Sequence, residues 1–208
     1  MVDKIVAYLL MSIIILCIVA VIISFLNTKK VIPFWNEFAK RLGLVPHMKT
    51  RFACLSNESK VEGIYRNHSV VLETDLYYIP DNEIYRIFTG SMLSVKTLNP
   101  NDVSMSVYPR YFKFFKFFNT TSKEDIKVGA PLFDELFEIR GNKEQEILRI
   151  LDSEIRTKII ALSDPKKFNM KIDGEIAFFI WKGLIKDIDM LISVTDILID
   201  IVEMLECR

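Results

Sequence analysis

Histidine is scarce in this sequence, and its scarcity limits the chemistry that the chain can support. The 208 residues include only His47 and His68, which show neither the HExxH pattern nor an i, i+4 spacing, and no cysteine lies at zinc-ligand spacing from either. The P-loop, the dinucleotide-binding GxGxxG pattern and the GxSxG nucleophile pattern do not occur in the sequence either. The sequence therefore predicts no metal site, no cofactor and no catalytic residue, and it argues against an enzyme.

Cysteine is also sparse, and neither sign of charge is in excess. Cys17, Cys54 and Cys207 form no close pair and no metal-ligand spacing, which fits reduced thiols in the cytosol. Lysine and arginine total 27, and aspartate and glutamate also total 27, so the formal net charge is zero. A chain without a basic field is not expected to bind nucleic acid.

Residues 5–26 form a long run without any charged side chain. At 1.5 Å per residue a helix of this length would be about 33 Å long, enough to cross a hydrocarbon core of about 30 Å. The run is too long for the apolar region of a secretory signal, and no A-x-A-like cleavage site follows it. We therefore expect a retained transmembrane helix that runs from Ile5 through Leu16 to Leu26.

Basic residues flank this run unequally. Lys4 precedes it, and Lys29, Lys30, Lys40 and Arg41 follow it. The positive-inside rule then places the C-terminal part of the chain in the cytosol of a single-pass cell-membrane protein. Three Asn-x-Ser/Thr sequons, at Asn57, Asn67 and Asn119, would matter only in the opposite orientation.

The pattern of apolar residues predicts an α+β fold. We expect helices at 33–43, 142–151, 152–162 and 185–206, and strands at 61–65, 68–73, 84–95, 103–107, 136–140, 168–172 and 175–181. Because this order lacks regular βαβ alternation, it predicts one domain with a mainly antiparallel sheet packed by helices. The predicted divisions are a transmembrane anchor at 1–28, a juxtamembrane helix and linker at 29–59, and a soluble domain at 60–208.

Two aromatic segments are candidates for contact with the lipid headgroup layer. One is the helix at 33–43, which follows the apolar run closely, and its alternative role is packing on its own domain. The other is 111–118, YFKFFKFF, whose lysines could face anionic lipid or could snorkel from a core element. The residues expected at the membrane are Trp35, Phe114, Phe115 and Phe118.

Several residues occur in the order of a known pattern: a helix with Trp, a strand pair with Gly, and a central signature. They are Trp35, Ala39, Leu42, Gly43, Leu44, Gly63, Asp125, Ile126, Gly129, Phe133, Asp134 and Phe137. On these residues the chain resembles an uncharacterised family of prokaryotic membrane-anchored proteins with a Gly-Asp-x-x-Phe-Asp-x-x-Phe signature. Ala130 stands where that signature has Asp. The resemblance implies the fold and the membrane-anchored setting, and it implies no reaction.

The central signature also has a physical interpretation. Gly129 and the following Ala-Pro pair break the chain, after which Phe133 and Phe137 would point the same way if they share a helical turn. Asp134 could then cap that turn or accept hydrogen bonds from the preceding loop. The motif corner (Gly129, Phe133, Asp134 and Phe137) thus either docks a strand on the core or lines a pocket for a cation or polar ligand. Asp196, Asp200 and Glu203 share one helix face and form a second candidate cation site, although a solvated face is the commoner role.

These observations favour a binding or assembly module at the membrane surface. Its expected partners are the lipid bilayer and a partner protein. The alternative hypothesis is a membrane-tethered enzyme with a site around Asp134, to which the fold would bring His68 or Asp125.

Overall fold

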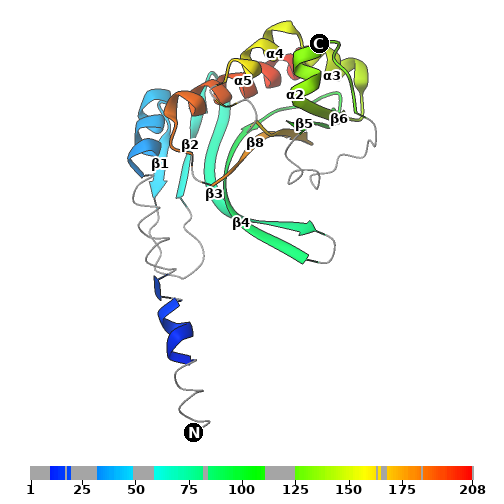
Figure 1. Ribbon diagram of the computed structural model, residues 1–208. Coiled ribbons are helices and arrows are strands. Elements are labelled where there is room, and N and C mark those ends of the chain that lie inside the picture. The colour runs from blue at the N-terminus through cyan, green and yellow to red at the C-terminus, as the bar shows by residue number, and fades with distance from the viewer. Residues whose placement is uncertain are drawn as a thin grey trace.

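The computed structural model describes residues 10–16, 18–19, 32–48, 59–81, 84–110, 125–162, 164, 168–183 and 185–207. Helical residues 10–16 and 32–42 come first. The labelled elements are β1 (Val45–Met48), β2 (Ser59–Tyr65), β3 (His68–Asp81), β4 (Ile84–Lys96), β5 (Met105–Pro109), α2 (Pro131–Leu136), β6 (Phe137–Gly141), α3 (Glu144–Ile150), α4 (Ser153–Ile160), β7 (Met170–Asp173), β8 (Ile176–Lys182) and α5 (Ile188–Glu206) (Figure 1). These elements confirm the predicted α+β class.

One curved antiparallel sheet organises the body, with strand order β1-β2-β3-β4-β8-β7-β5-β6. The helices α3, α4 and α5 lie over one face of it (Figure 1). The strand registers join fully buried residues into a continuous row under these helices. The row is Val61, Leu72, Leu93, Phe179, Met170, Val107 and Ile139. Burying such a row against α5 removes apolar area from water, which is the main source of stability.

The helix over residues 32–42 belongs to this core. Trp35 and Phe38 are fully buried, and the indole Nε1–H of Trp35 donates to the carbonyl of Ile185, 3.4 Å away. Gly43 ends the helix with a φ of +69°, a conformation that favours glycine, and Leu44 donates its N–H to Ala39. The packed body therefore begins before residue 60.

Two tight turns form where the sequence places them. Arg66 and Asn67 connect β2 to β3 with φ values of +48° and +65°, as a turn of two left-handed residues requires. Gly174, with a φ of +57°, connects β7 to β8. The structure also contains β1, which the sequence did not predict, and the helical turn considered around Phe133 is the short helix α2.

The predicted transmembrane helix at 5–26 is wrong. The helical residues that the structure describes in this region are 10–16 and 18–19. Among the residues that the structure describes, no helix combines the length and the apolar character needed to cross a membrane. Leu16 lies in the short helix, whereas Ile5 and Leu26 lie outside the described residues. The prediction of a single-pass transmembrane protein, which depended on this helix, is therefore wrong as well.

Candidate functional site

The motif corner is a bend that packs on the sheet. Gly129 has a φ of +72°, and the one-turn-and-a-half helix α2 follows with Pro131 in its first turn. Phe133 and Phe137 are fully buried, with ring centroids 4.7 Å apart. From Phe137, contacts between rings continue through Phe168 to Phe179 in the core row. The two phenylalanines of the corner thus join it to the core.

The carboxylate of Asp134 is occupied by the corner's own backbone. Its Oδ1 accepts the N–H of Val128 at 3.0 Å, so the side chain closes the loop before α2. The backbone carbonyl of Asp134 accepts the Arg110 Nε–H at 2.7 Å, and Arg156 donates to the carbonyl of Val128 at 2.7 Å. A carboxylate held in this way positions the loop before α2.

Asp125 is the centre of the polar contacts beside this corner. Its carboxylate accepts the backbone N–H of Ile139 at 3.0 Å and the Lys127 ammonium at 2.6 Å, and it also pairs with the Arg110 guanidinium. Partial burial by itself raises the pKa of Asp125, but the hydrogen bonds from Lys127, Arg110 and Ile139 outweigh it and lower the pKa. Asp125 is therefore held as a carboxylate that ties three segments together.

Arg110 and Asp125 flank residues 111–124, which include the aromatic segment, and they pair with each other. Arg110 N–H donates to Leu136 at 2.9 Å, and Ile126 N–H donates to Ile139 at 2.8 Å, so both ends of residues 111–124 are fixed at one corner. Phe114, Phe115 and Phe118 lie outside the described residues. Ile126 also covers the outer edge of β6, which blocks that edge from pairing with another strand.

A second polar group lies on β5 and β6, on the face of the sheet opposite α5. The Tyr108 hydroxyl donates to Glu138 Oε1 at 2.6 Å, and Arg140 donates to the same oxygen from Nη2 at 2.5 Å. Burial, strengthened by Glu138, raises the pKa of Tyr108, so its hydroxyl stays protonated.

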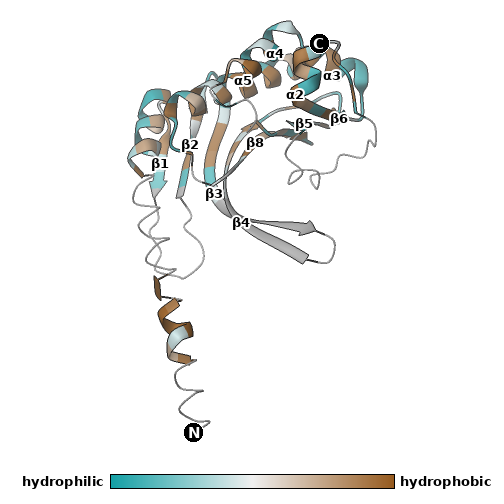
Figure 2. Ribbon diagram, viewed as in Figure 1, coloured by the Kyte–Doolittle hydropathy of each residue, from teal (hydrophilic) through white to brown (hydrophobic). Residues whose placement is uncertain are grey.

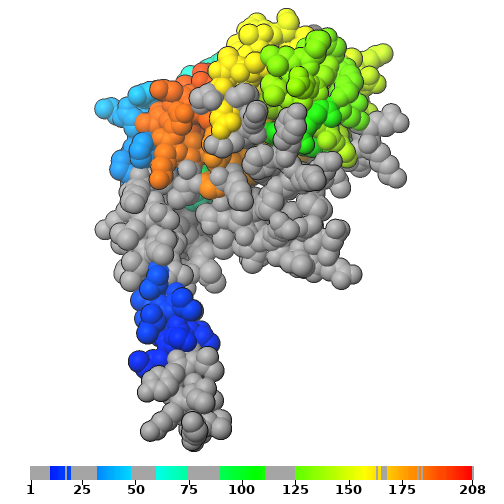
Figure 3. Space-filling view, viewed as in Figure 1, coloured from blue at the N-terminus to red at the C-terminus, as the bar shows by residue number. Residues whose placement is uncertain are grey.

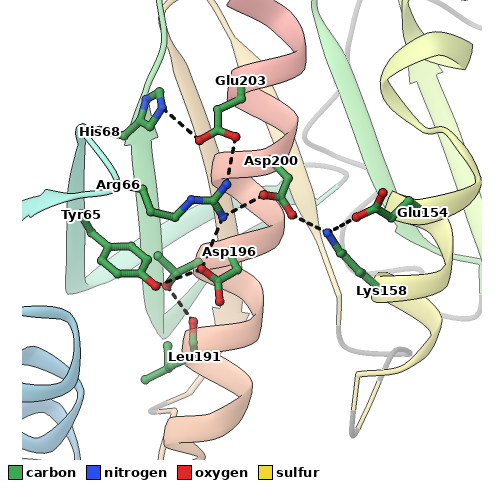
Figure 4. Close-up of polar contacts among 10 residues, drawn as sticks. Tyr65, Arg66, His68, Glu154, Lys158, Leu191, Asp196, Asp200 and Glu203 are labelled. Atoms are coloured by element: carbon green, nitrogen blue, oxygen red, sulfur yellow. Dashed lines mark hydrogen bonds and ion pairs between the residues drawn. The ribbon is translucent and has the colours of Figure 1, made fainter.

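The acidic face of α5 is bound by basic side chains of other elements (Figure 4). Arg66, from the β2–β3 turn, lies 2.8 Å from Asp200, 2.9 Å from Glu203 and 3.7 Å from Asp196. The Tyr65 hydroxyl donates to Asp196 at 3.2 Å. Because Arg66 and Tyr65 already engage these carboxylates, the carboxylates do not form the open oxygen cage that a cation needs.

Further contacts extend this network to two other helices. Lys158 of α4 bridges Glu154 and Asp200, at 2.6 and 2.9 Å, and these two acceptors raise the pKa of Lys158. Arg41, in the helix at 32–42, pairs with Asp189 at 2.8 Å. Within the described part of the chain, no three acidic, histidine or cysteine side chains are grouped to hold a metal ion.

The structure separates some residues that the sequence grouped together. Trp35, expected in the headgroup layer, is fully buried, because its ring fills the core and its N–H is used by Ile185. That expectation is wrong. His68 lies 3.8 Å from Glu203 on α5, in the network of Figure 4, and so it belongs to a different polar group from Asp134. Asp125 does lie beside Asp134. Arg110 contacts both, because it donates to the backbone carbonyl of Asp134 and pairs with the carboxylate of Asp125.

Sequence reasoning missed Arg110 and Arg66, which organise the two polar groups. Arg110 directly follows a buried strand and precedes the aromatic segment, and Arg66 sits in a two-residue turn. The position of each arginine at the end of a strand or in a turn was the only signal in the sequence. Their acidic partners lie too far away in the sequence to be predicted.

Comparison with known proteins yields one structural likeness. No protein-family model and no curated protein sequence matches the chain. The crystal structure of the mycobacterial trehalose monomycolate transport factor A, TtfA, matches with a TM-score of 0.53 and 10% identity, over 82% of this chain and 91% of TtfA. The likeness concerns the fold. TtfA shows that this arrangement of one sheet and its covering helices occurs in a second protein.

Proposed function

We propose that the chain is a non-catalytic binding module associated with a membrane, and that it presents the aromatic and lysine-rich sequence 111–118 from a fixed base. The observation that carries this proposal is the Arg110–Asp125 ion pair, which holds the two ends of residues 111–124 at one corner of the sheet. Binding residues are commonly carried on loops that a rigid scaffold positions.

The sequence of the presented segment suits a lipid surface. Residues 111–118 combine six aromatic residues with Lys113 and Lys116. Aromatic rings favour the boundary between headgroups and acyl chains, and lysines are attracted to anionic headgroups. A fixed base lowers the entropy that such a segment loses when it binds.

The N-terminal helical residues support the same setting. Large apolar side chains there are exposed, with Met11 at 61% and Leu16 at 68%. The ribbon of this helix is mostly coloured as hydrophobic (Figure 2). These residues project from the body, whereas α3 and α4 join the rest of the packed surface (Figure 3). Exposed apolar clusters of this kind mark contact with a protein or a membrane. The fold neighbour is a transport factor, which also supports a role in binding.

The occupied carboxylates support binding over catalysis. Asp134 accepts a backbone N–H, and Asp125 accepts three donors, so neither is placed as a general base. The enzyme alternative around Asp134 therefore has no support in the described geometry.

Photolabelling with a photoactivatable phosphatidylcholine tests the proposal. The full chain is bound to vesicles, irradiated and digested, and the labelled peptides are identified by mass spectrometry. We expect label in residues 111–118, with a fall of about tenfold when Phe114, Phe115 and Phe118 are all changed to serine, because the apolar area is lost.

Exposed apolar residues of the body provide the control. Ile64, Leu98 and Leu132 are 64%, 77% and 54% exposed, so a triple serine variant of these residues removes accessible apolar area elsewhere. That variant should leave the labelling of 111–118 unchanged. Labelling of 111–118 no greater than that of the peptides containing Leu98 and Leu132 would contradict the proposal.

A further inference from the structure

The hydroxyl of Ser106 has no hydrogen-bond partner. Ser106 is only 3% exposed, and its Oγ is the one buried side-chain polar atom without a partner among the residues that the structure describes. Burying a hydroxyl without a hydrogen bond is unfavourable, so such an atom requires an explanation. A ligand that supplies the missing acceptor is one explanation.

Two cationic side chains flank this hydroxyl. In the sheet, Ser106 of β5 lies directly opposite Arg140 of β6 and directly opposite Lys171 of β7. Neighbours on such a row have Cβ atoms about 5 Å apart and share one face. Because Met105 and Val107 point into the core under α5, the row Lys171–Ser106–Arg140 lies on the face opposite α5.

Both cations are partly buried and retain capacity for a further partner. The side chains of Lys171 and Arg140 are 17% and 23% exposed. Lys171 pairs with Asp173, which is itself 61% exposed, and exposed pairs of this kind exchange partners at little cost. Arg140 donates to Glu138 from two nitrogens, and a guanidinium has five N–H donors.

The ion pairs of the two cations leave the hydroxyl itself unengaged. Lys171 pairs with Asp173, and Arg140 pairs with Glu138. A hydroxyl between two cations fits an oxyanion, which accepts from all three.

We propose that the row Lys171–Ser106–Arg140 binds a phosphate group. The ligand is either free phosphate or the phosphate of an anionic lipid headgroup, and the lipid source rests on the membrane association proposed above. Lys171 and Arg140 bond the phosphate oxygens, and Ser106 donates its hydroxyl hydrogen to one of them. The site lies close to the Arg110–Asp125 base, where the phosphate of a lipid would be available.

Titration of the full chain with inorganic phosphate, followed by calorimetry in mild detergent, tests the site itself. We expect saturable binding that Lys171→Met weakens by about tenfold, because a charge-assisted hydrogen bond is lost, and that Ser106→Ala weakens by roughly fivefold. Lys40→Met removes the same charge from an exposed position and should bind as the wild type does. Thermal melting shows that the variants are folded.

Vesicle flotation distinguishes the two sources of phosphate. If phosphatidic acid added to phosphatidylcholine vesicles increases binding in the wild type but not in Lys171→Met, the ligand is a lipid headgroup. If free phosphate binds and phosphatidic acid adds nothing, the ligand is a soluble phosphate. Absence of saturable phosphate binding together with no effect of phosphatidic acid would overturn the proposal, and so would wild-type affinity in Lys171→Met and Ser106→Ala. The photolabelling experiment uses pure phosphatidylcholine and does not involve Lys171. It therefore tests membrane association independently of the phosphate site.

Discussion

Arg110 and Asp125, which lie 15 residues apart in the sequence, meet in an ion pair that also engages the backbone of β6 and α2. Arg110 donates to the carbonyl of Asp134, and Asp125 accepts the N–H of Ile139. One pair of side chains thus fixes the end of β5, the start of the next described segment and the edge of the sheet.

Asp125→Asn should lower the free energy of unfolding by about 1–3 kcal/mol, because a partly buried carboxylate with three donors becomes an amide that satisfies them poorly. Urea denaturation followed by circular dichroism measures the loss. The matched control is Arg149→Gln, which breaks an exposed pair with Glu146 on α3 and should change stability by less than about 0.5 kcal/mol. Equal effects of the two variants would contradict a special role for Asp125.

The lowered pKa of Asp125 predicts a pH dependence of stability. A carboxyl group whose pKa is lower in the folded than in the unfolded chain stabilises the fold above its unfolded pKa, and this contribution is lost as the pH falls through the folded pKa. The wild type should therefore lose more stability between about pH 5 and about pH 2 than Asp125→Asn loses, since the variant lacks this titration. Parallel curves of the urea midpoint against pH for the two proteins would rule this out.

Arg66→Gln should destabilise the chain through α5. Without the guanidinium, Asp196, Asp200 and Glu203 repel one another along one helix face, and we expect a loss of about 1–2 kcal/mol after allowance for the one-third exposure of Arg66. Adding Asp200→Asn to Arg66→Gln should recover part of the loss, because one of the repelling charges is removed. A double-mutant cycle measures this coupling. Strictly additive losses would show that the pair does not interact.

Gly141→Ala should be among the most damaging small substitutions. A Cβ at Gly141 would overlap both the Ile147 side chain and the carbonyl of Ser104, which is backbone and cannot move aside easily. We expect a loss of about 2 kcal/mol or more. Gly63→Ala is the comparison, because its Cβ would lie 3.0 Å from the end of the flexible Leu44 side chain and should cost less. Thermal unfolding of both variants tests the order, and a larger shift for Gly63→Ala would contradict it.

Local patterns in the sequence predicted most of the individual elements. The Asp173–Gly174 pair specified the β7–β8 hairpin, and the alternation in 103–107 specified β5, since both signals lie within a few residues. The order of the strands was not predictable in this way. β5 pairs with β7 and with β6, and β4 pairs with β8, across long separations for which one sequence carries no signal.

The candidate sites show the same limit. Asp134 could be predicted as an acceptor for the preceding loop, because its partner Val128 is only six residues away. The surroundings of Trp35 could not be predicted, because a tryptophan soon after an apolar run is equally typical of the headgroup layer and of a protein core. Its contact is Ile185, 150 residues away, and only the fold brings the two together.

The four-residue strand β7 joins the β5–β6 ribbon to the rest of the sheet through only three residue pairs, from Met105 with Ile172 to Val107 with Met170. Because so few pairs connect them, we expect the β5–β6 ribbon and the rest of the sheet to behave as two separate cooperative units. Amide hydrogens along β7 should exchange with solvent at a lower opening free energy than those of β3 and β4. The β5–β6 ribbon, with Ser106, Arg140 and the Arg110–Asp125 pair, would then loosen and separate from Lys171 on β7, while the part of the sheet that carries Arg66 remains intact.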